Sequence, residues 1–298
     1  MLQQFNERNR DLLVNINGQL VHRDKAAISP FDSAVQGGDA VWEGLRVYNG
    51  KIFRLTEHLD RLRSSAIALA FNQIPPHDSI RHEIRRTLQA NSMQDGVHIR
   101  LTLTRGIKIT SGMDPRLNQS GPTLIVLAEF KPPVYDKTGI TLITSSVRRF
   151  SPDFLDPKIH HCNLIQSILA KLEANRANAD DAVMLDARGF VAETNATHLF
   201  LVSAGTVITP RLVACPEGIT RAAVLDLCRQ SAIPSQERDI SLMEFYRADE
   251  VFCTGTMGEL VCVREIDGRS IGTAGQTPIL VRLEKLFCDL IQSDAELI

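Results

Sequence analysis

Two consecutive prolines, Pro132 and Pro133, are the feature that most restricts how this chain can fold. Proline locks φ and has no N–H to donate, so this pair cannot continue the β-strand that the residues before it predict. The chain has 298 residues, which is more than one hydrophobic core usually serves. We therefore predict a smaller N-terminal domain over 1–131, a linker over 132–138 and a larger C-terminal domain over 139–298.

Turn signals and apolar periodicity predict the elements of both domains. Asn17-Gly18 and Asn49-Gly50 each separate two short apolar runs, which is the signal of a β-hairpin. Helical spacing or strand alternation marks the other elements. Helices are predicted over 56–69, 77–91, 164–176 and 220–231, and strands over 97–104, 123–128, 140–145, 182–191 (a hairpin), 198–202 and 250–253. The order indicates an α+β or α/β protein whose N-terminal half is an antiparallel sheet with two helices.

Composition excludes several classes of partner. Lys+Arg of 33 against Asp+Glu of 35 gives a net charge of −2, so no basic surface is expected for nucleic acid or an anionic membrane. No apolar run approaches a membrane span, and the first residues lack a secretory signal. The six cysteines show no C-x-x-C and lie mostly in apolar contexts, so we expect small buried thiols in a cytoplasmic protein.

Common catalytic signatures are absent, and a metal site is not expected. The chain contains no G-x-G-x-x-G, no G-x-x-x-x-G-K-[ST], no H-E-x-x-H and no G-x-S-x-G. His160-His161-Cys162 is a dense group of metal-ligand types. Adjacent residues on a strand point to opposite faces, however, and tetrahedral sites need spaced ligands.

Four places carry groups suited to chemistry. Lys158 lies between a predicted strand and an apolar helix, and Glu193 follows a predicted strand. Ile219 and Thr220 begin a predicted helix, so their N–H groups can bind an anion. Residues 254–259 offer hydroxyls and amides directly after a strand. Each place taken alone also fits an ordinary loop lysine, turn or helix cap.

Six short strings stand in a characteristic order along nearly the whole chain. They are V-W-E-G-L-R (41–46), H-L-D-R-L (58–62), D-P-K (156–158), V-A-E-T-N (191–195), G-I-T-R (218–221) and T-G-T-M-G-E (254–259). In order and spacing they resemble the class IV, fold type IV pyridoxal-phosphate aminotransferases. That family includes branched-chain amino acid aminotransferases, D-amino acid aminotransferases and aminodeoxychorismate lyases.

The resemblance implies a two-domain enzyme with pyridoxal 5′-phosphate in the cleft between the domains. Lys158 is then the lysine that holds the cofactor as a Schiff base, Arg61 a ligand of its phosphate, and Glu193 the partner of its pyridine nitrogen. It also implies amino acid and 2-oxo acid substrates and a homodimer or higher homo-oligomer. Further cofactor contacts are implied at Thr194, Asn195, Ile219, Thr220 and Thr256.

The chemistry explains why these residue types are needed. A lysine able to lose its proton can anchor the cofactor and then move a proton between the substrate Cα and the cofactor C4′. A carboxylate beside the pyridine nitrogen favours its protonated form, which makes the ring an electron sink.

The branched-chain subgroup is the nearest resemblance. The E-G-L-R string, Arg100 and the loop Ser111-Gly112-Met113 resemble that subgroup, which implies transfer of an amino group from an L-branched-chain amino acid to 2-oxoglutarate. Substrate contacts are implied at Trp42, Gly44, His98, Arg100, Met113 and Met257.

Three departures leave other substrates open. Tyrosines of the branched-chain enzymes are replaced by Gly37, His98 and Asn163. A D-amino acid or (R)-amine transaminase, or an aminodeoxychorismate lyase-like enzyme, remains the alternative. A non-catalytic protein of this fold would have no reason to keep the lysine, the glutamate and the phosphate-binding arginine together.

Overall fold

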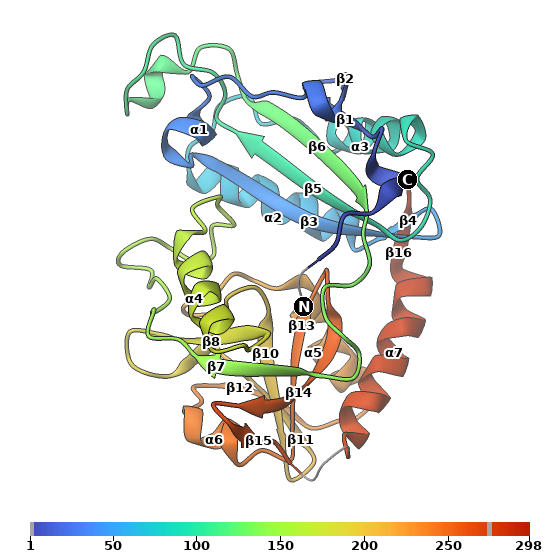
Figure 1. The fold of residues 1–298 in the computed structure, drawn as a ribbon, viewed down its shortest axis with the longest axis vertical. Helices are drawn as coiled ribbons and strands as arrows, with labels where there is room; N and C mark the ends of the chain where they lie inside the picture. The colour runs from blue at the N-terminus through green and yellow to red at the C-terminus, as the bar shows by residue number, and fades with distance from the viewer. Residues whose placement is uncertain (1–2, 273–275) are drawn as a thin grey trace. The chain divides into compact units, whose positions relative to one another are not determined.

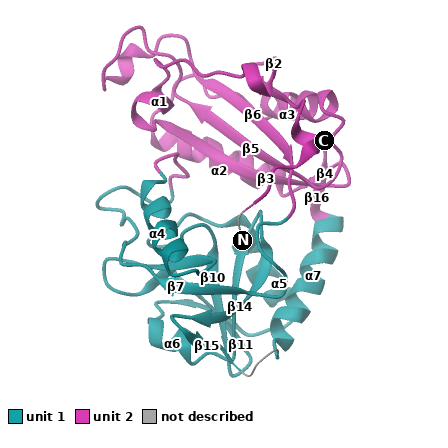
Figure 2. Cartoon of the chain, in the orientation of Figure 1, with its two compact units in different colours: residues 1, 133–158, 164–293 teal, residues 2–132, 159–163, 294–298 magenta. Residues whose placement is uncertain are grey.

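The computed structural model describes residues 3–272 and 276–298, which form two units (Figures 1 and 2). The described residues of unit 2 are 3–132, 159–163 and 294–298; those of unit 1 are 133–158 and 164–293, apart from 273–275. The chain passes from unit 2 to unit 1 between Pro132 and Pro133. It returns to unit 2 directly after Lys158 and again at its end. These two returns differ from the contiguous domains that the sequence predicts.

Unit 2 is an antiparallel sheet with helices on one face. Its seven described strands lie in the order β16–β4–β3–β5–β6–β1–β2, and helices α2 and α3 cover one face (Figure 1). Ile99 and Leu101 of β5 are fully buried in this core, so His98 and Arg100, which alternate with them, point to the other face. The elements are β1 Leu13–Ile16, β2 Gln19–His22, α1 Ser33–Gly37, β3 Ala40–Tyr48, β4 Lys51–Phe53, α2 Leu55–Ala68, α3 His77–Ala90, β5 Val97–Thr104, β6 Thr123–Phe130 and β16 Ala295–Leu297.

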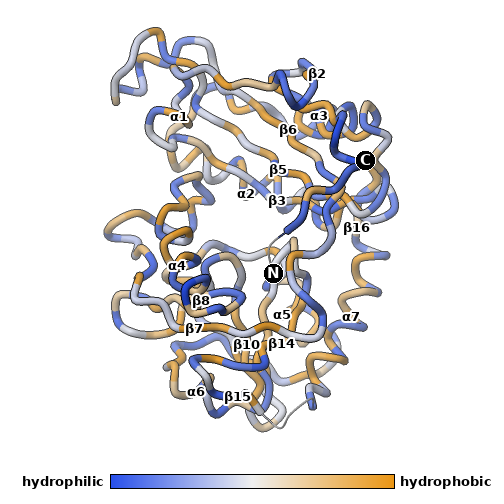
Figure 3. The backbone as a smooth tube through the Cα atoms, in the orientation of Figure 1, coloured by the Kyte–Doolittle hydropathy of each residue, from blue (hydrophilic) through white to orange (hydrophobic). Residues whose placement is uncertain are grey.

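Unit 1 is built on a mixed sheet. Its described strands follow the order β12–β11–β10–β13–β14–β7–β8–β9, with β15 paired to β14. Strand β7 runs parallel to β8 and β14, and β11 runs parallel to β12. The strands carry long apolar stretches (Figure 3). The elements are β7 Ile140–Thr144, α4 Ile165–Arg176, β8 Asp181–Leu185, β9 Val191–Thr194, β10 His198–Ser203, β11 Thr206–Pro210, α5 Ile219–Gln230, β12 Ser235–Arg238, α6 Leu242–Tyr246, β13 Glu250–Gly255, β14 Glu259–Ile266, β15 Arg269–Ser270 and α7 Pro278–Asp294.

The predicted hairpins and helices are confirmed, with shifts of a few residues at their ends. Asn17-Gly18 and Asn49-Gly50 both adopt positive φ at the two turn positions, as the tight hairpin turns require. The four predicted helices are α2, α3, α4 and α5. Helix α7 was not predicted, although Leu280, Leu283 and Phe287 recur at helical spacing and are buried.

The cysteines differ in part from the expectation. All six are free, and Cys215, Cys228 and Cys253 are buried as expected. Cys288 is exposed because it lies on the outer side of α7, and Cys162 and Cys262 are half-buried. Among the described residues, no helix combines the length and apolar character needed to cross a membrane.

Candidate active site

Strands β9, β10 and β13 bring candidate residues to one edge of the unit 1 sheet. Glu193 lies on β9, opposite Met184 of β8. The chain then turns through 195–197 and begins β10 at His198, which pairs with Thr254 near the end of β13. The end of β9, the start of β10 and the end of β13 therefore lie together.

Helix α5 begins at the same edge. Its N-cap, Gly218, packs on His198 so closely that a Cβ at Gly218 would lie 2.3 Å from the imidazole ring. As a glycine, this N-cap residue has no side chain with which to cap the first turn of α5. The N–H groups of Ile219 and Thr220 therefore lie in the first turn of a helix, where amides without intrahelical partners suit an anion, and their role in binding one stays a prediction.

The end of β13 and the turn after it carry hydroxyl groups at this edge of the sheet. Thr254 Oγ1 is buried and, within the described chain, has no hydrogen-bond partner. A Cβ on Gly255 would lie 3.1 Å from Thr197 Cγ2, so the turn packs tightly on the β9–β10 connection. Thr256 and Met257 follow, both half-buried. An unpaired buried hydroxyl next to an uncapped helix suits an anionic group such as a phosphate.

The Glu193 carboxylate is buried and paired with an arginine that the sequence analysis missed. Glu193 is 3% exposed, and Arg149 Nη2 donates a hydrogen bond to Glu193 Oε1. Arg149 Nη1 also donates to Ser167 Oγ at 3.0 Å. Burial lowers the pKa of Arg149 to about 10, so the guanidinium stays charged at neutral pH. The guanidinium places a positive charge beside the buried carboxylate, which favours the ionised form of Glu193.

Lys158 lies near these groups in unit 1. Its side chain is 48% exposed, and Nζ lies 3.5 Å from Glu217 Oε1, directly before the N-cap of α5. Burial raises the pKa of the Cys215 thiol to about 11, against the opposing positive charges of Arg221, Arg149 and Lys158. The charges of Lys158 and Arg149 thus both act on the Cys215 thiol, which places the two side chains in the same part of unit 1.

Thr194 and Asn195 shape the turn after Glu193. Thr194 Oγ1 accepts hydrogen bonds from the Ala196 and Thr197 amides at 3.1 and 2.8 Å. Asn195 Oδ1 accepts from the Ala182 amide at 2.8 Å. Both side chains are thus engaged in holding the connection between β9 and β10.

Four predicted substrate residues lie on the face of the unit 2 sheet opposite α2 and α3. Gly44 pairs with Arg100 across β3 and β5, and a Cβ on Gly44 would lie 3.5 Å from both His98 Nε2 and Trp42 Cζ3. The Arg100 guanidinium stacks 3.4 Å from the Trp42 ring centroid, and no carboxylate of the described chain forms an ion pair with it. Burial and neighbouring cations lower the pKa of His98 to about 3. This face therefore presents a charged guanidinium beside a neutral imidazole.

Arg61 contacts the opposite, helix-covered face of that sheet. Its Nε and Nη2 donate to the two carboxylate oxygens of Glu43 at 2.8 and 2.7 Å. Glu43 and Gly44 are consecutive on β3, so their positions face opposite sides. Unit 2 thus brings Arg61 together with Glu43, to which the sequence analysis assigned no role. Arg100 lies on the other face of the sheet.

The segment 159–163, directly after Lys158, pairs with the edge of β3. Trp42 N donates to His160 O at 3.0 Å, and Cys162 N donates to Ala40 O at 2.8 Å. Asn163 Nδ2 donates to Gly38 O at 3.1 Å. No three His, Cys, Asp or Glu side chains among the described residues are grouped to hold a metal ion.

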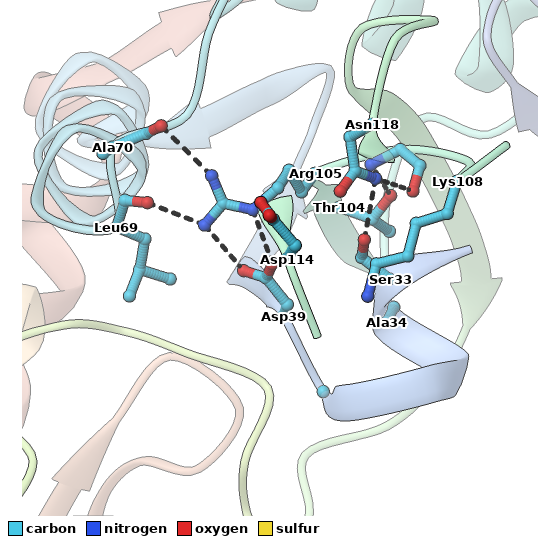
Figure 4. A network of polar contacts seen from close by, with 12 residues as sticks. Ser33, Ala34, Asp39, Leu69, Ala70, Thr104, Arg105, Lys108, Asp114 and Asn118 are labelled. Atoms are coloured by element: carbon cyan, nitrogen blue, oxygen red, sulfur yellow. Dashed lines mark hydrogen bonds and ion pairs between the residues drawn. The ribbon is translucent and has the colours of Figure 1, made fainter. Parts of the chain in front are cut away.

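Met113 is 98% exposed on the loop between β5 and β6. The base of the loop is held by two polar side chains of unit 2 (Figure 4). Arg105 bonds to the Asp39 carboxylate and the Leu69 and Ala70 carbonyls, and Asn118 bonds to Ser33 Oγ and Gly106 O. Within unit 2 the loop is anchored at its base, and the role of Met113 in substrate contact stays a prediction.

Comparison with known proteins places this geometry in a family. The chain is 56% identical over 280 residues to branched-chain-amino-acid aminotransferase-like protein 2 of Arabidopsis thaliana, covering 94% of this chain and 50% of that protein. The chain thus spans about half the length of that relative. It is 38% identical to a putative branched-chain-amino-acid aminotransferase of Methanocaldococcus jannaschii, covering 93% of this chain and 96% of that protein.

A solved structure shares the fold. It is a T.th. branched-chain amino acid aminotransferase complexed with N-(5′-phosphopyridoxyl)-L-glutamate, with a TM-score of 0.88, 31% identity and coverage of 95% of each chain. Residues 40–266 match the family described as amino-transferase class IV. The match includes both the Glu43–Arg61 pair and the β9, α5 and β13 edge. The chain therefore belongs to the class IV aminotransferases, with the fold type IV architecture that the sequence predicts.

Proposed function

We propose that the chain is a pyridoxal-phosphate-dependent aminotransferase that moves the amino group of an L-branched-chain amino acid to 2-oxoglutarate. The products are the corresponding 2-oxo acid and L-glutamate. The observation that carries the proposal is the grouping, in unit 1, of Lys158, the buried Glu193–Arg149 pair and the uncapped start of α5. The names of the relatives support the donor class, and the glutamate moiety of the solved complex supports glutamate as the amino partner.

The residues of unit 1 fit the cofactor. The Ile219 and Thr220 amides and the Thr256 hydroxyl would hold its phosphate, and the unpaired Thr254 hydroxyl indicates that this edge suits an added acceptor. Arg61 of unit 2 is proposed to add a charged donor. When bound, pyridoxal phosphate supplies an aldehyde for amino transfer and a ring that takes up the electrons released at the substrate Cα.

Lys158 and Glu193 have separate roles in the proposed reaction. Lys158 Nζ anchors the cofactor and, once released, moves the proton between the substrate Cα and the cofactor C4′. Glu193, with the Arg149 charge beside it, would accept a hydrogen bond from the protonated pyridine nitrogen. Thr194 and Asn195 are proposed to act through the turn that carries Glu193.

The face of the unit 2 sheet that carries Arg100 suits a substrate with an aliphatic side chain. Arg100, without an ion pair in the described structure, is proposed to bind a substrate carboxylate in a bidentate manner. Gly44 adds no side chain there, and the Trp42 ring and the uncharged His98 imidazole beside it suit an aliphatic side chain next to the charged Arg100. Met257 and Met113 are proposed to add apolar contacts.

One donor panel tests the proposal. Purified protein with pyridoxal phosphate and 2-oxoglutarate is given L-leucine, L-valine, L-isoleucine, D-alanine or (R)-1-phenylethylamine, and glutamate formation is measured. We expect the highest kcat/KM with an L-branched-chain donor. In Lys158→Ala we expect no turnover, and borohydride should fix no cofactor to the protein. A higher kcat/KM for D-alanine or the (R)-amine would replace the branched-chain assignment, and adduct formation in Lys158→Ala would remove the role of Lys158.

A further inference from the structure

The Glu43 carboxylate is the centre of a buried polar cluster in unit 2. The residue is 0% exposed, on the face of the sheet that α2 covers. His58 Nδ1 lies 2.6 Å from Oε2, Arg61 binds both oxygens, and His160 Nδ1 lies 3.2 Å from Oε1. We call these four residues the Glu43 cluster.

The charges in this cluster favour an ionised carboxylate. Burial by itself would raise the pKa of Glu43, but the charge of Arg61, together with hydrogen bonds from Arg61 and His160, brings it well below its usual range. Burial and the Arg61 charge lower the pKa of His160 to about 4, despite the opposing effect of Glu43. The cluster is therefore built around one carboxylate and one guanidinium, with His160 neutral at pH 7.

The contacts of Glu43 limit the orientations open to Arg61. Nε and Nη2 of the guanidinium are both engaged by the carboxylate, so one side of the planar fork is fixed in direction. The side chain remains 13% exposed, so the guanidinium is not sealed from solvent. A ligand phosphate would meet a preoriented arginine rather than a mobile one.

His160 extends the cluster to the chain that follows Lys158. Its ring stacks on Trp42, with the centroids 4.4 Å apart. Its backbone is held as well, because the His160 amide donates to Ser65 Oγ at 3.0 Å. His160 is two residues beyond Lys158, so Glu43 helps to fix the segment that leaves the proposed anchoring lysine.

We propose that Glu43 is a positioning residue that orients Arg61 for the cofactor phosphate and, through His160, fixes the chain after Lys158. This inference rests on the proposed function, because it assumes that Arg61 binds the phosphate. Glu43 itself lies beneath the guanidinium and acts on the cofactor only through its neighbours. Loss of Glu43 should therefore weaken binding of the phosphate more than binding of the pyridine ring.

Comparing two ligands isolates that effect. Equilibrium dissociation constants are measured for pyridoxal 5′-phosphate and for pyridoxal, which lacks the phosphate, by absorbance titration of the full chain. Glu43→Gln is expected to raise the dissociation constant of pyridoxal phosphate roughly tenfold or more, because a hydrogen bond to a charged group contributes enough free energy for a change of that size. The dissociation constant of pyridoxal should change less than about twofold. In an Arg61→Gln background, Glu43→Gln should add little, because its effect passes through the arginine.

Two further variants keep the test decisive. Glu43→Asp retains the buried charge but shortens the side chain, so it covers the case in which Glu43→Gln does not fold, and it should show the same selective loss for the phosphate. Glu296→Gln is the matched control, because Glu296 is a carboxylate of the same unit that pairs with a different arginine, Arg81, at 2.7 Å. It should leave both constants unchanged.

The outcomes distinguish a failure of the role proposed for Glu43 from a failure of the proposed function. Equal losses for both ligands, or no loss in either Glu43 variant while Arg61→Gln remains selective for the phosphate, would overturn the inference alone. If Arg61→Gln fails to discriminate the two ligands, the role of Arg61 is wrong and the inference falls with it. If wild-type protein binds neither ligand, the proposed function itself fails.

Discussion

Buried ionisable side chains at the candidate site are either paired with an opposite charge or surrounded so that they stay neutral. Glu193 is held by Arg149 in unit 1, and Glu43 by Arg61 in unit 2. Burial, reinforced by neighbouring cations, lowers the pKa of His98. A positive charge beside each carboxylate favours its ionised form, and the imidazole of His98 stays uncharged at neutral pH.

Glu193→Gln should reduce turnover far more than cofactor binding. A neutral amide cannot stabilise a protonated pyridine nitrogen, so we expect kcat/KM to fall by about 100-fold or more and the cofactor dissociation constant to change less than tenfold. Steady-state kinetics and absorbance titration measure the two effects. Glu173→Gln, which alters a carboxylate bonded to Ser145 and Ser146 in the same unit, is the control and should change neither. Parallel losses in both quantities would contradict the role of Glu193.

His98 should make the protein less stable as the pH falls. Its pKa is about 3 in the folded chain against an ordinary value of 6.5, so the unfolded chain binds the proton more readily between these values. Stability is therefore full above about pH 6.5 and is lost toward pH 3, by up to about 1.4 kcal/mol for each pH unit. Thermal unfolding of His98→Gln should show a shallower decline from pH 7 to pH 5 than wild type. The exposed His82→Gln should follow wild type, and a His98→Gln profile parallel to wild type would contradict the assignment.

At the scale of elements, the position of the start of helix α5 depends on two glycines. Each of them packs closely against the chain at or just before the start of β10. Gly218 lies against His198 and Gly255 against Thr197, so both backbone segments approach the turn after Glu193. A side chain at either position would displace the helix start or the β13 turn from it. The amides of α5 keep their place because nothing larger than hydrogen occupies these two contacts.

Gly218→Ala tests this close approach. The new Cβ would lie 2.3 Å from the His198 ring, so the helix start must shift, and we expect weaker binding of pyridoxal phosphate and a lower unfolding temperature. Gly37→Ala is the matched control, because no atom lies within 4 Å of its Cβ position at the end of α1. Isothermal titration and thermal unfolding measure both variants. Unchanged cofactor affinity in Gly218→Ala would contradict the proposed phosphate site at α5.

On the scale of the whole chain, helix α4 presents an apolar face that its own unit does not cover. Ile165, Ile168, Leu169 and Leu172 are each between 45% and 61% exposed and recur at helical spacing. Contiguous exposed apolar surface commonly marks a protein interface. We infer that this face contributes to the homodimer that the family resemblance implies.

The α4 face gives a direct test of assembly. Ile168→Glu combined with Leu172→Glu places two charges on it, so we expect a smaller particle than wild type by size-exclusion chromatography with light scattering. Val281→Glu, an exposed apolar position on α7, is the control and should leave the mass unchanged. A wild-type monomer would remove the homodimer proposal, and an unchanged mass in the double variant would place the interface elsewhere.

Local sequence patterns determined much of the fold and part of the candidate site. The Asn-Gly turns and the helical spacing in α2, α4 and α5 report local backbone preferences, which depend on neighbours a few residues away. The roles predicted for Lys158, Glu193 and Ile219 rest on the order in which their surrounding strings occur along the chain. Their environment follows from contacts that no string contains.

Only the tertiary structure decided how those residues are held. Arg149 reaches Glu193 across 44 positions of sequence, and His160 reaches Glu43 across 117. Segment 159–163 adds to the edge of β3, and β16 adds to β4, from distant parts of the chain. Pairing of this kind is set by burial of charge and by free strand edges in the folded chain, which periodicity within one segment does not encode. The sequence therefore determined which groups this protein carries, and the tertiary structure decided their partners and their charge.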